Sequence, residues 1–139
     1  GVLNKPSRVL EFPSSVADLV LLALNRMNLS GADFQEDMIS CPLEYENGTE
    51  ISLIIICQAE AGGWFRNEKP VVSFSFVELN DEQKIIRVLD TDKLDFPTSP
   101  QDLMFLTKFI ARVRAIGWTI AAVGQMGECL NLPNRPVVG

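Results

Sequence analysis

The chain contains short segments in which apolar residues recur at every second position, and two longer segments with broad apolar stripes. Residues 71–79 show the first pattern clearly, because three large apolar side chains alternate with Ser73 and Ser75. Such alternation predicts a half-buried strand. Residues 53–57 are apolar on both faces, which is typical of a central strand.

Turn signals join these strands into two hairpins. Asn47-Gly48 lies between extended runs at 38–45 and 49–60, and Asn-Gly is a strong hairpin signal because both residues tolerate positive φ. A polar turn then connects residues 71–79 to a further strand at 85–89. Weak alternation over residues 9–12 predicts a short edge strand near the N-terminus.

The first helix is expected from Ser14 to about Asn28, with a serine hydroxyl as its cap and Asp18 in a capping-box-like position. It is apolar almost all round, which predicts burial on more than one side. Either a further layer of this chain covers it, or a homodimer forms through Leu21, Leu24 and their neighbours.

The second helix has the clearest start signal in the chain. We expect Ser99 to cap it, Pro100 to take its first position and Gly117 to end it. The residues before it, 90–98, are expected to form a loop, and residues 118–123 a last strand.

The order helix, hairpin, hairpin, helix predicts an α+β fold. The simplest arrangement is a four- or five-stranded antiparallel sheet with both helices on one face, which leaves the other face free. The length of 139 residues suits a single domain over residues 1–139, with residues 1–13 and 125–139 largely irregular.

Charge narrows the range of partners. The formal net charge is −6, and no cluster of Lys and Arg is present to neutralise phosphates. We therefore expect neither nucleic-acid binding nor binding to an anionic membrane surface. No apolar stretch is long enough to span a bilayer. A cytoplasmic location is expected, with a secreted or periplasmic one left open.

Catalytic and metal chemistry find little support in the sequence. The chain has no His, which excludes Ser-His, Cys-His and zinc-His sites within it. Asp90, Asp92 and Asp95 supply spaced acids, but the glycine and terminal glutamate of a calcium loop are missing. We predict a non-enzymatic protein without a metal or other cofactor.

The chain has three cysteines, Cys41, Cys57 and Cys129. An odd number argues against a complete disulfide framework, so reduced, structural thiols are expected. Pairing of Cys41 with Cys57 across the first hairpin stays open for an oxidising compartment.

An acidic run coincides with the first hairpin. Residues 31–60 carry seven acids and no Lys or Arg, so the rest of the chain sums to +1. Strand alternation places Glu44 and Glu46 on one face, and Glu50 begins the next strand. These carboxylates are candidates for contact with a basic partner protein, and the alternative is a solvated outer face.

Trp64 and Phe65 follow two glycines in the loop between the hairpins. Large aromatic side chains dominate binding hot spots, which makes this loop a second candidate contact. The alternative is that both rings fold back onto the sheet edge.

Together these features predict a non-catalytic protein-binding module of the chaperone, immunity or adaptor type. In small size, acidity and the order of its elements, the chain resembles type III secretion chaperones and the immunity proteins of toxins, a resemblance of general character that implies no role for any single residue. The alternatives are a small-ligand-binding or enzymatic domain, or a structural domain of a larger protein. If the acidic hairpin binds a basic partner, reversing the charges of Glu44 and Glu46 together should slow association with that partner.

Overall fold

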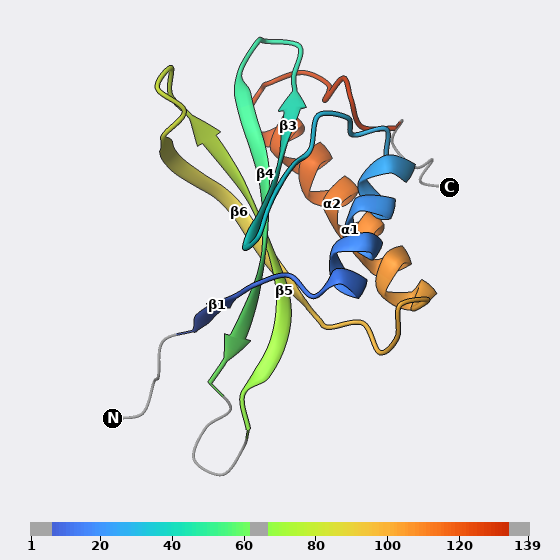
Figure 1. Ribbon diagram of the computed structural model, residues 1–139. Coiled ribbons are helices and arrows are strands. Elements are labelled where there is room, and N and C mark those ends of the chain that lie inside the picture. The colour runs from blue at the N-terminus through green and yellow to red at the C-terminus, as the bar shows by residue number, and fades with distance from the viewer. Residues whose placement is uncertain (1–6, 62–66, 134–139) are drawn as a thin grey trace.

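Six antiparallel strands form one sheet, and two helices cover one of its faces (Figure 1). The computed structural model describes residues 7–61 and 67–133. The predicted α+β class and the placement of the helices are confirmed, with slightly more strands than the four or five expected. The elements are β1 (Arg8–Leu10), α1 (Ser14–Arg26), β2 (Asp33–Gln35), β3 (Met38–Glu44), β4 (Glu50–Glu60), β5 (Lys69–Leu79), β6 (Ile85–Asp95) and α2 (Leu103–Val123).

The strand order is β2-β3-β4-β5-β6, and β1 pairs with β4. Strands β1 and β3 share one edge of β4, since β3 pairs with its residues 50–55 and β1 with its residues 57–59. The predicted first hairpin is confirmed: the turn closes when the Gly48 N–H donates to the Tyr45 carbonyl at 3.0 Å. Only Gly48 of the Asn-Gly pair has positive φ, at 78°.

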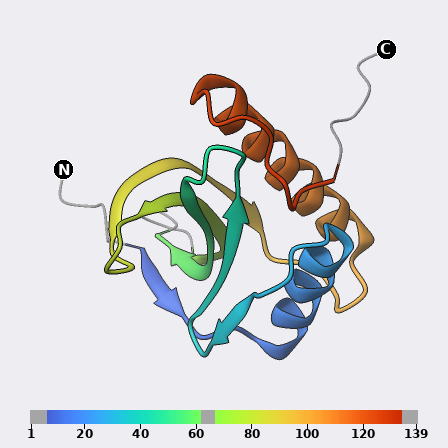
Figure 2. The ribbon, with the colours of Figure 1, turned by 90° about the horizontal axis from the view of Figure 1, so that it is seen from above.

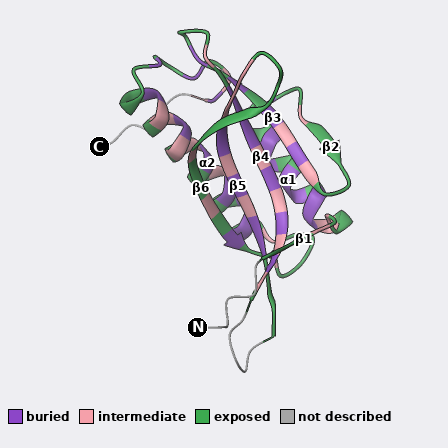
Figure 3. Ribbon diagram, turned by 90° about the vertical axis from the view of Figure 1, so that its left-hand side faces the viewer, coloured by how far each residue is buried: buried purple, intermediate pink, exposed green. Residues whose placement is uncertain are grey.

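Alternation along the strands separates two faces of the sheet. On β5, Val72, Phe74 and Phe76 are buried toward the helices, as predicted, while Ser73 and Ser75 lie on the opposite face. Figure 3 shows that opposite face, which carries no helix. The core therefore lies between the sheet and the two helices, and within residues 7–61 and 67–133 no helix covers the second face.

Helix α1 begins differently from the prediction. Its N-cap is Pro13, whose carbonyl accepts from the N–H groups of Val16 and Ala17, and no side chain caps the helix. Leu24 is buried in this chain's own core, whereas Leu21 is 36% exposed. The predicted dimer surface through both residues is therefore wrong for Leu24, because α1 already buries that side against the sheet.

Helix α2 also corrects four predictions. Asp102, rather than Ser99, caps it by accepting from the Phe105 N–H at 3.1 Å, so Leu103 rather than Pro100 takes the first helical position. Gly117 does not end the helix, which continues to Val123 and replaces the strand expected at 118–123. Gly117 is instead a point of close packing, where an added Cβ would lie 2.5 Å from Leu132 Cδ1.

Strand β6 extends to Asp95, so the loop expected at residues 90–98 is mostly strand. Continuous pairing with β5 overrides the low strand preference of its aspartates. Bulges interrupt the pairing near Val77 and near Leu79, and the sheet is strongly curved (Figure 2).

The segment after α2 is not a free extended tail over its described part. Residues 126–131 lie along the outer edge of β3, where Leu130 donates to the Glu44 carbonyl at 2.7 Å. The Asn131 amide contacts both the Pro42 carbonyl and the Glu44 N–H at 3.0 Å. The buried Tyr45 hydroxyl donates to the Gly117 carbonyl at 3.1 Å and ties the first hairpin to α2.

Candidate functional site

A groove of about 870 Å³ lies at the end of the sheet where the first hairpin and the β5–β6 hairpin meet. We call it the sheet groove. Strand β3, the first half of β4, the end of β5 and the start of β6 supply most of its lining. Its apolar surface comes from Met38, Pro42, Ile54, Leu79, Ile85 and Leu130.

Two of the predicted contact residues meet in this groove. Glu44 and Glu50 are direct cross-strand partners in the β3–β4 ladder, and both line the groove. Gln83 donates to Glu50 Oε2 at 3.4 Å, but neither carboxylate forms an ion pair within the described residues. Like charges directly opposite each other destabilise a sheet, so this arrangement has a cost in the free protein.

Removing one of these charges is expected to stabilise the fold. Replacing Glu44 with Gln keeps the side-chain length and removes the cross-strand repulsion, which should raise the free energy of unfolding by about 0.2–1 kcal/mol. Chemical denaturation measures the change. The matched control is Glu11→Gln, since Glu11 is also exposed but has no cross-strand acid. Equal effects of the two substitutions would show that the Glu44–Glu50 pair is not special.

The structure does not bring Glu46 into this pair. Glu46 lies in the turn after β3, where its backbone N–H donates to the Glu128 carbonyl at 3.1 Å. Its side chain packs against Gly127, so that a Cβ there would overlap the carboxylate. Glu46 does not continue the alternation of the strand, because β3 ends at Glu44. Trp64 and Phe65 lie outside the described residues, and their role stays a prediction.

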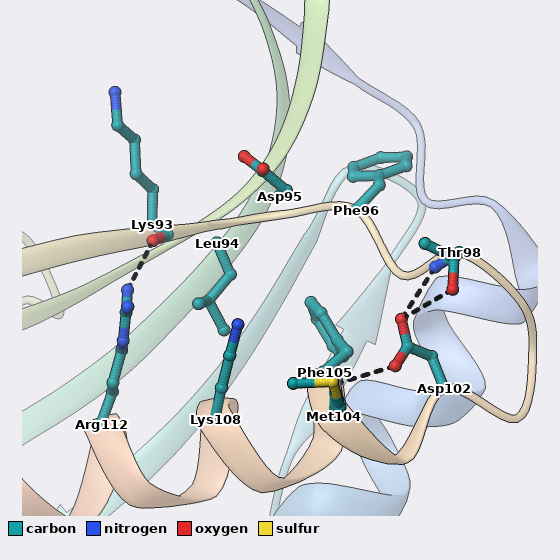
Figure 4. Close-up of a pocket in the computed structure, with 10 residues that line it drawn as sticks. All are labelled: Lys93, Leu94, Asp95, Phe96, Thr98, Asp102, Met104, Phe105, Lys108 and Arg112. Carbon is teal, nitrogen blue, oxygen red and sulfur yellow. Dashed lines mark hydrogen bonds between the residues drawn. The ribbon is translucent and has the colours of Figure 1, made fainter.

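A second groove of about 410 Å³ runs between β6 and α2 (Figure 4). Lys108 and Arg112 rise from α2 toward β6, and Arg112 donates to the Lys93 carbonyl at 3.0 Å. Asp102 is occupied as the helix cap, and hydrogen bonds from the Thr98 and Phe105 backbone lower its pKa below the ordinary value. Most polar groups here are thus engaged within the protein.

The three thiols are free and buried. Cys41 pairs with Leu53 of β4, whereas Cys57 pairs with Val72 of β5. The two cysteines are therefore not opposite each other, and a disulfide between them across the first hairpin does not fit this register. Burial raises the pKa of Cys41 to about 11 and that of Cys57 to about 12. Both thiols stay protonated at neutral pH and offer no thiolate nucleophile.

These raised pKa values predict a loss of stability at alkaline pH. Unfolded thiols ionise near their ordinary value of 9.0, whereas the folded thiols stay protonated until about pH 11–12. The stabilising contribution of the protonated thiols is therefore full below pH 9 and declines as the pH rises toward 11 for Cys41 and toward 12 for Cys57. Denaturation at increasing pH should show a steeper decline for the wild type than for Cys57→Ala, and equal slopes would contradict this origin.

Sequence reasoning missed several groove residues, chiefly Leu79, Gln83, Ile85 and Leu130. Leu79, Gln83 and Ile85 belong to the β5–β6 hairpin and Leu130 to the segment after α2, and the fold alone brings both segments to the first hairpin. One signal was available: Ile85-Ile86 and Val88-Leu89 place apolar residues at adjacent positions on both faces of an edge strand. Such a strand exposes apolar surface on at least one face.

Comparison with known protein families, curated proteins and solved structures finds no match for this chain. Across residues 7–61 and 67–133, neither helix has both the length and the apolar character needed to cross a membrane. In the same part of the chain, no group of three His, Cys, Asp or Glu side chains is arranged to hold a metal ion.

Proposed function

We propose that this protein is a protein-binding module whose sheet groove accepts a basic, extended segment of a partner protein. The observation that supports this most is the facing pair Glu44–Glu50 on the wall of a groove whose described lining contains no Lys or Arg. A cation bound between these carboxylates relieves the repulsion that the free protein retains.

The groove supplies both parts of a binding surface. Its apolar side chains, such as Pro42, Ile54 and Leu130, offer area that an extended segment covers. Its two carboxylates favour Lys or Arg at one position and draw a basic partner toward the groove. No residue of α1 or α2 is among the described residues that line the groove, so neither helix closes it to such a segment.

A small-ligand or catalytic role has less support from the geometry. The described lining of the sheet groove holds Ser40 and Ser52, but no His, Cys or Lys that would activate a hydroxyl. The Ser52 hydroxyl donates to the Cys41 carbonyl at 3.4 Å and is buried. The groove's chemistry therefore favours recognition of charge and apolar surface over reaction.

A library of short immobilised peptides tests the proposal directly. We expect the wild-type protein to retain peptides that combine Lys or Arg with apolar residues. The Glu44→Lys/Glu50→Lys variant should lose those peptides while remaining folded. Selection of acidic peptides, or of none above background, would overturn the proposal.

A further inference from the structure

Exposed strand edges can pair with further strands. In the described part of this sheet, other segments or side chains occupy the backbone groups along much of the edges of β3 and β6. The outer edge of β3 is covered along its first half by β2. Along its second half, hydrogen bonds from Leu130 and Asn131 occupy Pro42 and Glu44. A partner strand therefore finds no free backbone on this edge.

The second half of β6 is closed in a different way. The Asp90 side chain accepts from the Thr91 N–H, and the Asp92 side chain accepts from the Lys93 N–H, each at 2.8 Å. Arg112 of α2 occupies the Lys93 carbonyl. These side chains satisfy the backbone groups that an added strand would need.

The first half of β6 lacks such protection. Among the described residues, none hydrogen-bonds the backbone of Ile85–Leu89 from outside the sheet. Ile85 is 55% exposed, and Ile86 and Val88 are each 57% exposed. Two bulges against β5 bend this half of the strand. Arg87 is the only charged residue among residues 85–89, so the edge has little protection from charged side chains. It is thus both an open edge and an exposed apolar strip.

Charge indicates which kind of segment fits there. Arg87 pairs with Glu78 at 2.7 Å, and Lys84 pairs with Glu82 at 3.8 Å, so neither cation is left to attract an acidic segment. Ile85 is also a wall residue of the sheet groove, which makes the strip continuous with it. A chain that leaves the groove at Ile85 meets this edge next.

We propose that residues 85–89 of β6 bind the partner by strand addition, pairing with an uncharged, apolar segment adjacent to the basic one. This inference rests on the proposed function. The partner's basic residues then occupy the groove at Glu44 and Glu50, and the partner's adjacent apolar residues form a further strand beside β6. Main-chain hydrogen bonds supply affinity in such pairing, and alternate side chains contact Ile86 or Val88.

The test uses a labelled peptide from the library, one that combines basic and apolar residues. Val88→Lys should weaken its binding by about tenfold, because a charge then faces an apolar segment. The control is Val123→Lys, since Val123 is 79% exposed at the end of α2. Binding that Glu44→Lys/Glu50→Lys abolishes but Val88→Lys leaves unchanged overturns the strand addition alone. Binding that neither variant affects overturns the proposed function as well.

Backbone methylation of the peptide separates strand pairing from apolar contact. Methyl groups on alternate peptide nitrogens remove the N–H donors on one side of an extended chain. One of the two alternating patterns should weaken binding by about tenfold or more, and the other should have little effect. Equal binding of both methylated peptides overturns strand addition.

The other occupant of an open edge is a second copy of this chain. The mass of the free protein in solution checks that case. A monomer at the concentrations used for binding is the expected result. A dimer that Val88→Lys dissociates would assign this edge to self-association and overturn the inference.

Discussion

Replacing Phe109 with Ala is expected to lower the free energy of unfolding by about 3–5 kcal/mol. Phe109 is fully buried where α2 meets the sheet. Its ring lies 5.2 Å from that of Phe74 in an edge-to-face arrangement and 6.1 Å from that of Phe105. The substitution leaves a cavity at the contact that holds α2 on the sheet. Small domains have only about 5–15 kcal/mol of stability, so the loss is severe.

Denaturant titration followed by circular dichroism measures this loss. The control on the same helix is Leu103→Ala, because Leu103 is 66% exposed and its truncation leaves no cavity. It should change the free energy of unfolding by less than about 0.5 kcal/mol. A comparably small effect of Phe109→Ala would mean that α2 is not held by this cluster.

Reversing both groove charges is expected to have the largest effect on binding. Each substitution in Glu44→Lys/Glu50→Lys adds two charges, so the net charge changes from −6 to −2. The two lysines face each other as the glutamates did, and they repel a basic peptide from the groove. Association should slow by roughly tenfold or more at low salt, and the effect should shrink as salt is added.

The control separates the local charge from the net charge. Glu11→Lys/Asp18→Lys also changes the net charge to −2, but both residues are exposed and do not line the sheet groove. Its association rate should stay near that of the wild type in stopped-flow or surface-based kinetics. Equal slowing of association by the two variants would mean that the overall charge attracts the peptide. No slowing by either variant would mean that electrostatic steering does not contribute to association.

Local sequence patterns predicted the parts of the fold that local physics controls. The alternation around Ser73 and Ser75 identified β5, and Asn47-Gly48 identified the first hairpin. The prediction that Gly117 ends the helix was wrong, because it rested on the local preference of glycine for helix ends. In the folded protein, Gly117 lies within α2 and lets Leu132 pack close to the helix. The second half of β6 was missed because its aspartates disfavour strands, and pairing with β5 decides the outcome.

The candidate site likewise combines residues that local sequence predicts with residues that only the tertiary fold brings together. The acidic run made Glu44 and Glu50 visible in the sequence, and strand register then placed them opposite each other. Glu46 was misplaced because the strand ends before it and the segment after α2 holds its backbone. No local pattern shows that Leu130 joins Leu79 and Ile85 in one groove, since the segment after α2 and the β5–β6 hairpin must both meet the first hairpin.

Mapping where a bound peptide contacts the protein tests whether the sheet groove is the binding site. Backbone amide shifts in NMR spectra are recorded while a basic, apolar peptide from the library is added. We expect the largest shifts around the sheet groove, in residues 40, 41, 43, 44 and 50–54, and along residues 85–89 of β6, with little change in α1 and α2. Shifts concentrated on α2 near Lys108 and Arg112 would place binding in the other groove and contradict the account.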